Sequence, residues 1–338
     1  MLKRVLVLVT GFTLLLLLVQ RAGAALPREW FTFQSHHQGD RDIYLMDTRL
    51  GLSINLTQNP ATDYNPALSP DGSQLAFVSL RENNRDIYLF DLHTRMLSNL
   101  TEHAQSDLEP DWSPDGTHLS FTSWRSGLIT IYTMALDNRE AERIAHASYN
   151  DTDAVWSPDG RSLAYTSWQD GNGEIYTLDL TTDTQRNISL DDLSNDYNPT
   201  WSPDGRKLAF ISWRDGNMEV YVADVVTRTM TNISQHPSND SRPAWSPDSS
   251  KLAFISNRDR HYEVYVSDLT GDAWQVSGGH YCISDMDPSW SADGARVLFV
   301  SWRSDRTEVW SADALGQGVA LLGKYRDRHP ALLPRGCV

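Results

Sequence analysis

A four-residue turn, Ser-Pro-Asp-Gly, recurs at an almost constant interval along this chain of 338 residues. Successive copies are 44 or 45 residues apart. The intact copies begin at Ser69, Ser113, Ser157 and Ser202, and two altered copies begin at Ser246 and Ser291. A period of about 40 to 45 residues with several short strands per unit is typical of a β-propeller, in which each repeat forms one small sheet.

One unit shows the strands of the repeat. Asn198–Ser202 is a short extended run, strand A, and Pro203–Gly205 supplies the fixed φ, the carboxylate and the permissive backbone of a tight turn. Leu208–Ser212 and Glu219–Asp224 are rich in branched and aromatic residues and are expected to form strands B and C. A short strand D ends at Asn232–Ser234. Each repeat is therefore expected to be a four-stranded antiparallel sheet.

Counting the repeats predicts the size of the ring. Strands B, C and D occur seven times, because a first set at 31–57 precedes the first turn without its own strand A. A degenerate copy of strand A and its turn lies at 329–336. It is expected to pair with the N-terminal set and close the ring. Closure removes a sheet edge that would otherwise be open to aggregation. The sequence predicts an all-β fold, one seven-bladed propeller over residues 25–338, with essentially no helix.

The N-terminus differs in character from the repeats. Lys3 and Arg4 precede an apolar run from Val5 to Val19, and Ala22–Ala24 follows as a small-residue cleavage pattern. This order is typical of a secretory signal peptide, predicted over residues 1–24. The apolar run is short for a membrane span, which needs about 20 residues. We therefore expect an exported protein, periplasmic or extracellular, without a stable membrane span after cleavage.

The charge of the chain limits its partners. The formal net charge is −15 at pH 7, and removal of the predicted signal peptide takes away three of the 29 basic residues and no acidic one. The mature surface, at −18, repels nucleic acid and anionic lipid. It favours cations, basic protein segments or neutral ligands. Solubility alone is the alternative explanation of this charge.

Two cysteines are present, Cys282 and Cys337. Export makes a disulfide the first consideration. In the predicted topology, however, Cys282 lies in a connection that leads into a strand A, and Cys337 lies beyond the far end of the closing strand. The two cysteines are therefore expected on opposite faces, and the disulfide stays an open question.

An aspartate three residues ahead of the strand A proline position is present in all seven repeats. A residue that every blade keeps is expected to serve the blade itself. Its short carboxylate can cap backbone N–H groups in the tight connection between blades. These structural aspartates are Asp63, Asp107, Asp151, Asp196, Asp240, Asp285 and Asp327. We expect the strand A tryptophans Trp112, Trp156, Trp201, Trp245 and Trp290 to form core between blades for the same reason.

Two residues after each aspartate the repeats differ from one another. A ring of unlike polar groups at the mouth of the central channel suits a surface that recognises a ligand, although any polar residue would also suffice there. The ring consists of Asn65, Glu109, Asp153, Asn198, Arg242, Asp287 and His329. Three repeats place two carboxylates together, and oxygen-rich clusters of this kind can hold Ca²⁺. The spacing matches no full calcium loop, so the expectation is no cofactor, with Ca²⁺ as the alternative.

A second candidate surface follows strand B, in loops that open on the same face as the connections into strand A. An exposed aromatic side chain beside polar groups is a good platform for a peptide or a sugar, and Trp and Arg are favoured at binding hot spots. The alternative is that each tryptophan packs on the next blade and each arginine pairs with a neighbouring aspartate. The candidates for partner binding are Trp124, Arg125, Trp168, Trp213, Arg214, Trp302 and Arg303.

The repeat as a whole resembles a known family. Pro-x-Trp-Ser-Pro-Asp-Gly, Leu-Ala-Phe-x-Ser, an Arg-Asp-Gly loop, Ile-Tyr-x-x-Asp-Leu and Asn-Leu-Thr look like the repeat of the TolB-type, WD-repeat-like propellers, from Trp30 to Gly336. The namesake of that family is a periplasmic protein that binds partners of an envelope system through its propeller face. The resemblance implies protein binding, but seven blades and the lack of a separate N-terminal α/β domain indicate a TolB-like protein rather than TolB.

Signals for catalysis are weak in the sequence. There is no Gly-x-Ser-x-Gly elbow, His-Glu-x-x-His motif, phosphate loop or dinucleotide fingerprint. The first expectation is therefore a non-catalytic binding protein for an envelope or extracellular protein. The alternative is a carbohydrate-active or metal-dependent lyase or hydrolase whose site, at the channel mouth, would use Glu109, Asp153, Asp287, His329 and Arg242. Neither the ligand nor the oligomeric state follows from the sequence.

Overall fold

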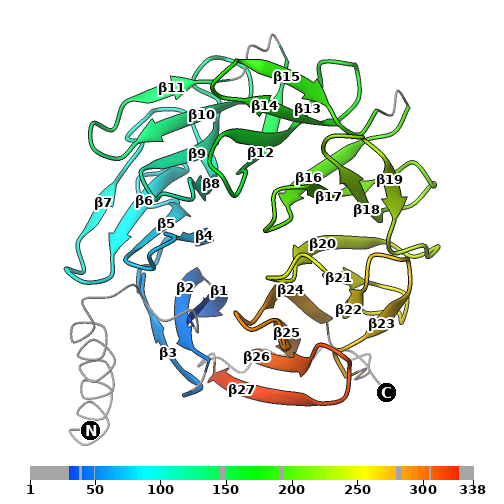
Figure 1. Cartoon of the computed structure of the whole chain (residues 1–338). Coiled ribbons are helices and arrows are strands. Elements are labelled where there is room, and N and C mark those ends of the chain that lie inside the picture. The colour runs from blue at the N-terminus through cyan, green and yellow to red at the C-terminus, as the bar shows by residue number, and fades with distance from the viewer. Residues whose placement is uncertain are drawn as a thin grey trace, which may run out of the picture.

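Seven small sheets surround a central axis in the computed structural model, like the blades of a propeller (Figure 1). The structure describes residues 30–37, 40–48, 50–144, 149–190, 193–278, 284–303 and 306–326. Within these residues there is no helix. Each sheet is a meander in which consecutive strands pair antiparallel. The predicted all-β, seven-bladed fold is confirmed.

The strands follow the predicted order A to D in blades 2 to 7, and the described residues of blade 1 form strands B to D. Blade 1 has β1 (Trp30–His37), β2 (Asp40–Asp47) and β3 (Leu52–Asn55); blade 2 has β4 (Asp63–Leu68), β5 (Gln74–Ser79), β6 (Asp86–Asp91) and β7 (Leu97–Asn99). Blade 3 has β8 (Asp107–Trp112), β9 (His118–Ser123), β10 (Thr130–Ala135) and β11 (Ala141–Arg143); blade 4 has β12 (Asp151–Trp156), β13 (Ser162–Ser167), β14 (Glu174–Asp179) and β15 (Thr184–Asn187). Blade 5 has β16 (Asp196–Trp201), β17 (Lys207–Ser212), β18 (Glu219–Asp224) and β19 (Met230–Asn232); blade 6 has β20 (Asp240–Trp245), β21 (Leu252–Ser256), β22 (Glu263–Ser267) and β23 (Ala273–Gln275). Blade 7 has β24 (Ser284–Trp290), β25 (Arg296–Arg303), β26 (Arg306–Asp313) and β27 (Val319–Arg326).

The recurring turn holds the hairpin between strands A and B by side-chain hydrogen bonds. In the first copy, the Ser69 hydroxyl donates to Asp71 Oδ1 at 2.6 Å, and the same oxygen accepts the backbone N–H of Ser73 at 2.9 Å. Gly72 closes the turn at a φ of 70°, which favours glycine. The serine hydroxyl also accepts the N–H of Gln74 at 2.9 Å. The Ser-Pro-Asp-Gly repeat is therefore explained by the backbone groups that it satisfies.

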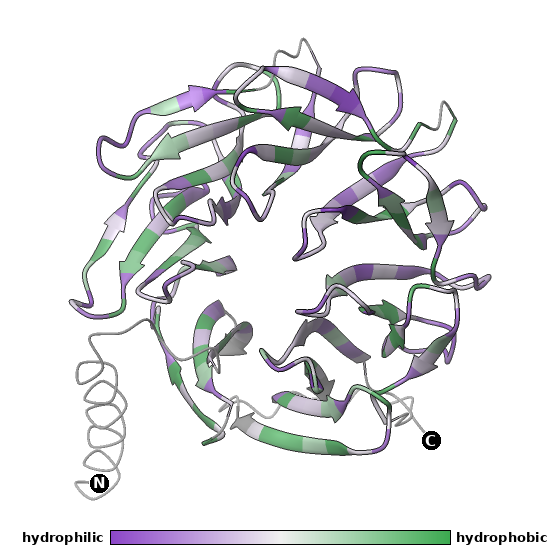
Figure 2. Cartoon of the chain, in the orientation of Figure 1, coloured by the Kyte–Doolittle hydropathy of each residue, from purple (hydrophilic) through white to green (hydrophobic). Residues whose placement is uncertain are grey.

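The hydrophobic core lies between the blades. Ala209, Val220 and Val222 of blade 5 pack with Phe254 and Tyr265 of blade 6, and every other described seam follows the same plan. Figure 2 shows the hydrophobic residues concentrated along the strands and the hydrophilic ones in the connecting loops. Because each blade buries its faces only against its neighbours, the ring is stabilised seam by seam.

The ring is closed by packing between its first and last blades. Phe31, Phe33 and Met46 of blade 1 share one buried cluster with Val300 and Val309 of blade 7. The predicted closing strand at 329–336 lies outside the described residues, as do the predicted signal peptide at 1–24, Cys282 and Cys337.

Candidate functional site

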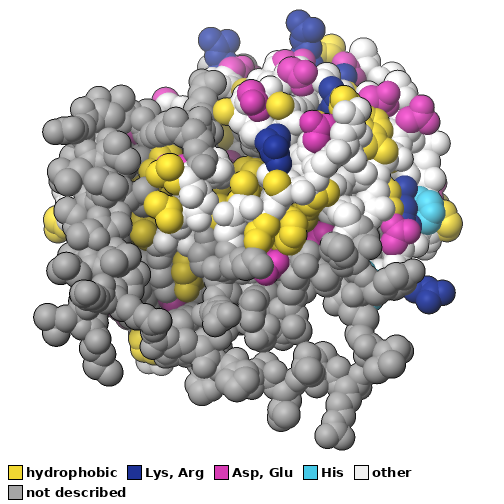
Figure 3. Space-filling model, turned by 90° about the horizontal axis from the view of Figure 1, so that it is seen from below, with side chains coloured by type: hydrophobic (Ala, Val, Ile, Leu, Met, Phe, Trp, Pro, Cys, Tyr) yellow, Lys and Arg dark blue, Asp and Glu magenta, His cyan; other side chains and the backbone are white. Residues whose placement is uncertain are grey.

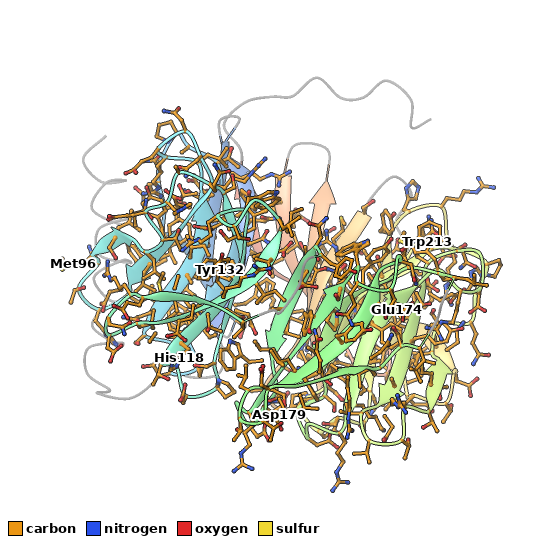
Figure 4. All side chains as sticks on the ribbon, turned by 90° about the horizontal axis from the view of Figure 1, so that it is seen from above. Met96, His118, Tyr132, Glu174, Asp179 and Trp213 are labelled. Atoms are coloured by element: carbon orange, nitrogen blue, oxygen red, sulfur yellow. The ribbon has the colours of Figure 1, made fainter. Side chains whose placement is uncertain are left out.

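The two faces of the ring are built from different loops. The loops between strands B and C and the connections into strand A lie on one face, here called the upper face; the Ser-Pro-Asp-Gly hairpins and the turns between strands C and D lie on the lower face. In Figure 4 Trp213, from the B–C loop of blade 5, is at the upper edge, and His118 and Asp179 are at the lower edge. The described B–C loops therefore open on the same face as the connections into strand A.

The variable polar positions of strand A form a ring of backbone bulges around the channel. In each of the six described strands A the register with strand B shifts at this point, so two residues oppose one. The residues at the bulge are Asn65, Glu109, Asp153, Asn198, Arg242 and Asp287, with φ between 50° and 58°. We call these six residues the channel ring. A bulge with a left-handed residue re-aims its side chain, and such bulges are common next to binding sites.

The channel ring surrounds a cavity. A space of about 630 Å³ is lined by Asn65, Asn198, Arg242 and Asp287, by the prolines that follow them, and by β1. These residues come from blades 1, 2, 5, 6 and 7, so the cavity lies on the axis of the ring. The Arg242 guanidinium and the Asp287 carboxylate form an ion pair there. The channel is thus polar and lined by both signs of charge.

Two acids of the channel ring, Glu109 and Asp153, belong to one hydrogen-bond network. Thr122 Oγ1 donates to Glu109 Oε2 at 2.8 Å, and the backbone N–H of Asp153 donates to the same oxygen at 3.2 Å. Asn198 Nδ2 donates to Asp153 Oδ1 at 2.9 Å. Burial raises the pKa of both carboxyls, and the Asp153 charge raises that of Glu109 further. Such a pair releases its protons less readily than two carboxyls in water.

The structural aspartates form ion pairs with arginines of the B–C loops in four blades. In blade 5, Arg214 Nη2 lies 2.9 Å from Asp196 Oδ2 and Arg214 Nε donates to Ser212 Oγ at 2.8 Å. The guanidinium carbon lies 4.6 Å from the centre of the Tyr221 ring. The four pairs are Asp63–Arg81, Asp107–Arg125, Asp196–Arg214 and Asp240–Arg258, at 2.8 to 3.1 Å.

These pairs refine the predicted roles. We expected the aspartate carboxylates to cap backbone N–H groups, whereas in four blades they accept hydrogen bonds from arginine. It is the aspartate backbone N–H that reaches the preceding blade, as in the 2.7 Å bond from Asp196 to the Gly173 carbonyl. Arg125 and Arg214 are largely withdrawn from solvent, with 14% and 16% of their side chains exposed. Both arginines therefore hold the loops of the upper face in place, and little of either side chain is accessible to a partner.

Blade 4 departs from this arrangement. Gln169 replaces the arginine, and neither carboxylate oxygen of the fully buried Asp151 accepts a hydrogen bond within the described residues. Tyr165 replaces the phenylalanine of the other blades, and its hydroxyl accepts a hydrogen bond from Gln185. Burial raises the pKa of Asp151 to about 6, although Ser167 and Arg143 act in the opposite direction. The exchange of Arg for Gln was visible in the sequence, but its effect on Asp151 was not predicted.

The tryptophans of the B–C loops differ in exposure. Trp213 is 41% exposed, and Trp124 and Trp168 are half-buried, with Trp168 in a tilted contact with Tyr197. Leu193, in the connection before blade 5, is 92% exposed. Other exposed apolar side chains of the upper face belong to Leu80, Leu128, Tyr149 and Leu190. Five of the six exposed side chains, Leu128 to Trp213, lie on blades 3 to 5 and their connections.

Several candidates lie partly or wholly outside the described residues. His329 and Asp327 are not described. The backbone of Trp302 and Arg303 belongs to β25, but their side chains are not described. Their predicted roles therefore stay predictions.

Exposed apolar side chains also lie on the outer strands. They belong to Leu50 and Leu52 of blade 1 and to Leu315 and Val319 of blade 7. Figure 3, seen from the bottom edge of Figure 1, shows hydrophobic side chains gathered on the rim of the ring.

Searches for two other kinds of site gave negative results within the described ranges. No group of three or more His, Cys, Asp or Glu side chains there is arranged to hold a metal ion. None of the described residues forms a helix with the length and apolar character that a membrane crossing requires.

Fold and channel together define a closed β-propeller in which four blades have an aspartate–arginine pair. The family model described as the TolB beta propeller domain matches residues 28–155, 66–198 and 153–338. The chain therefore belongs to the TolB β-propeller family. No curated protein is similar enough to match the chain.

Solved structures with this fold include both binding proteins and enzymes. A putative TolB from Agrobacterium tumefaciens is 20% identical with a TM-score of 0.57, covering 84% of this chain and 89% of that one. An oligogalacturonate lyase in complex with manganese is 17% identical with a TM-score of 0.69, covering 85% and 86%. A puromycin-hydrolyzing peptidase of Mycobacterium tuberculosis is 15% identical with a TM-score of 0.70, covering 92% of this chain and 54% of the peptidase. At these identities the likeness extends to the fold alone.

Proposed function

We propose that this protein is an exported, non-catalytic binding protein that docks another protein on its upper face. The observation that carries the proposal is the exposed Trp213 indole on a loop that is firmly held. The backbone N–H of Trp213 donates to the Asn195 carbonyl at 3.1 Å, and the backbone N–H of Gly216 donates to the Trp213 carbonyl at 3.0 Å. A rigid exposed aromatic side chain loses little entropy on binding, which is the property of a hot-spot anchor.

The surroundings of Trp213 support a protein ligand. Exposed apolar side chains accompany it on blades 3 to 5, as described above, and polar groups of the channel ring lie nearby on strand A. Large apolar side chains grouped on one face are typical of protein–protein interaction sites. The net charge of −15 favours a partner segment that carries basic residues. Half-buried Trp124 and Trp168 extend this surface, and Glu109, Asp153, Arg242 and Asp287 form its inner border.

A comparison of two single variants tests this proposal. Trp213→Ala removes the proposed anchor, and Met96→Ala removes an equally apolar side chain that is exposed on a turn between strands C and D. Both purified proteins are used as bait in envelope extract, captured proteins are identified by mass spectrometry, and affinities are then measured with the purified partner. We expect Trp213→Ala to weaken binding at least tenfold and Met96→Ala to leave it unchanged. Equal binding by the two variants would contradict the proposed face.

Export is a separate part of the proposal. It rests on the basic residues, apolar run and small-residue pattern of residues 1–24. N-terminal sequencing of the protein purified from its native cell tests it. We expect the mature chain to begin at Ala25; an intact Met1 in the cell envelope fraction would show instead that the segment is retained.

A second candidate function rests on the carboxyl pair in the channel. Glu109 and Asp153 are joined through the Asp153 N–H, and both have raised pKa values. A carboxyl with a raised pKa can serve as the general acid in the cleavage of polysaccharides. Incubation with a panel of polysaccharides, with and without divalent metals, tests this candidate. Product formation that Glu109→Gln abolishes would favour it over docking.

A further inference from the structure

The seam between blades 3 and 4 concentrates acidic side chains on two adjacent inner strands. Glu109 and Asp111 lie on β8, and Asp151 and Asp153 lie on β12. We call these four residues the acidic seam. At the position of Asp111 the other described blades have Ala67, Val155, Thr200, Ala244 and Ser289, none of which is ionisable. Asp111 is therefore particular to this seam, whereas Asp151 belongs to the aspartate series of every repeat, and Glu109 and Asp153 belong to the variable channel ring.

Two of these carboxylates join the blades directly. Glu109 Oε2 accepts the backbone N–H of Asp153 at 3.2 Å, and Asp111 Oδ2 accepts the backbone N–H of Trp156 at 2.9 Å. Both bonds cross from β8 to β12. The contact between the blades therefore depends on side chains that can take up a proton.

The usual seam contacts are weakened here. Trp112, Trp201, Trp245 and Trp290 each donate an indole N–H to a carbonyl of the preceding blade, at 2.9 to 3.3 Å. Trp156, the matching residue of blade 4, has a buried indole N–H with no acceptor within the described residues. The aspartate–arginine pair is also missing, because Gln169 stands in place of arginine.

No member of the acidic seam has an ion-pair partner within the described residues. The charged and titratable groups of the elements around the seam are otherwise occupied or more distant. They are Tyr64 with Arg85, the Asp107–Arg125 pair, His118, Arg143, Tyr165, Asp170, Tyr176 and the Asp196–Arg214 pair. Of the cations in this set, Arg143 acts on Asp151 from the outer strand β11. Ionisation of the seam therefore adds negative charges that the neighbouring blades do not neutralise.

We propose that the acidic seam is a proton-sensitive joint of the ring: proton uptake in mild acid tightens blade 3 against blade 4, and proton loss near neutral pH loosens the ring at this seam. A protonated carboxyl keeps an acceptor oxygen, so the two bonds that cross the seam survive protonation. What protonation removes is the cost of buried, unpaired charge. In an exported protein, the pH of the surroundings then determines how firmly blade 3 packs against blade 4.

The pKa values of the seam agree with this direction. Burial raises the pKa of Asp111 and of Asp151 to about 6, and burial together with the neighbouring charge raises that of Glu109. A carboxyl with a folded-state pKa above its unfolded value binds protons more tightly when folded. Its unfavourable contribution therefore appears as the pH rises from about 4 to above 6, and it disappears again on acidification.

Hydrogen exchange measured by mass spectrometry tests the joint on the full mature chain, in buffers that contain EDTA. Exchange is compared at pH 5.0 and pH 7.5 after correction for the intrinsic rate. Peptides that cover β8 and β12 are expected to lose protection at least tenfold at pH 7.5 relative to the β20 peptides. In the double variant Asp111→Asn, Asp151→Asn, this difference between the two pH values is expected to fall below threefold. The control Asp272→Asn, at an exposed position before β23 in blade 6, is expected to behave as the parent.

Three results would overturn the proposal. The first is equal protection of β8 and β12 at both pH values in the parent protein, a result that does not depend on how any variant folds. The second is an equal loss of protection across all blades, which would indicate a global effect of pH. The third is a double variant that keeps the full pH dependence of the parent.

Discussion

The first five residues of the B–C loops in blades 4 and 5 differ at a single position, yet the two loops are held in different ways. Ser167–Asn172 and Ser212–Asn217 share the sequence Ser-Trp-x-Asp-Gly-Asn, with Gln169 in one and Arg214 in the other. The loop backbones match, since Gly171 and Gly216 both have positive φ and both bond back to the tryptophan carbonyl. The same loop conformation thus accommodates an arginine that pairs with Asp196 in blade 5 and a neutral glutamine in blade 4.

The surroundings of the two loops have changed together. Around Arg214 lie Phe210, Met230 and the carboxylate of Asp196. The matching residues of blade 4 are Tyr165, Gln185 and Asp151, and a Tyr–Gln hydrogen bond lies where blade 5 has only apolar groups. The first residue of strand C in the preceding blade also differs, with Thr130 before blade 4 and Glu174 before blade 5. Blade 4 thus lacks the arginine and also the acid that accompanies it in blade 5.

Removing the arginine should expose the largest difference between the two blades. Arg214→Ala leaves Asp196 buried without its partner and is expected to lower the free energy of unfolding by about 3–5 kcal/mol. Gln169→Ala removes only a half-buried neutral side chain and is expected to cost less than about 1 kcal/mol. Urea denaturation followed by tryptophan fluorescence measures both values. Similar losses in the two variants would mean that the Asp196–Arg214 pair has no special role.

The two aspartates should respond to neutralisation with opposite signs. Asp151→Asn is expected to raise the free energy of unfolding by about 1–3 kcal/mol at pH 7, because it removes a carboxyl whose pKa is raised to about 6. The gain should vanish below about pH 4, where the carboxyl is protonated in both states. Asp196→Asn breaks the pair with Arg214 and should be destabilising at neutral pH. Denaturation of both variants at pH 4 and pH 7 gives the two signs.

The strand A tryptophans give a smaller contrast. Trp201→Phe removes an indole that donates to the Val155 carbonyl, and the lost hydrogen bond is expected to cost about 0.5–1.5 kcal/mol beyond the change in volume. Trp156→Phe makes the same change in volume but removes a buried N–H without an acceptor. The second variant should therefore be more stable than the first, by about 1 kcal/mol or more. Thermal unfolding of the pair is the measurement, and equal midpoints would contradict the assignment of the orphan N–H.

Transfer of the arginine into blade 4 should have the smallest effect. In blade 5 Arg214 Nη1 approaches the Met230 sulfur at 3.3 Å, whereas Gln185 in the matching place is bonded to Tyr165. Gln169→Arg is therefore expected to change the free energy of unfolding by less than about 1 kcal/mol, because the gain of a pair with Asp151 is offset by loss of the Tyr–Gln bond. In the Tyr165→Phe, Gln185→Met background the same substitution should stabilise by more. Equal effects in both backgrounds would show that the three positions are not coupled.

The predicted fold followed from features that act within one repeat. The Ser-Pro-Asp-Gly turn satisfies its own backbone groups, as the Ser69–Asp71 bond shows, so each copy marks a hairpin wherever it occurs. The alternation of short strands and the period then specify blades and their number. The sequence also placed the B–C loops and the connections into strand A on one face, because antiparallel strands return to the same edge.

The candidate site was predicted less completely, because it depends on contacts between repeats. The channel ring was identified by its variability, but its bulged backbone was not, although four of its six described members are Asn or Asp, which adopt positive φ most readily. Asp111 was passed over because it looked like one more polar strand residue. The unpaired state of Asp151 could not be read from the aspartate series, which is unbroken.

The sequence by itself determined the blade, the number of blades and the side on which each loop opens, because hydrogen bonds and strand pairing inside one repeat are local. Only the tertiary structure decided which aspartates are paired, which tryptophan is exposed and where four acids meet on two neighbouring strands. Those properties depend on what the adjacent blade brings to each seam. Burial then determines their effect on stability. An ionised carboxyl costs no desolvation free energy in water, but between two blades it destabilises the fold unless a cation pairs with it or a proton neutralises it.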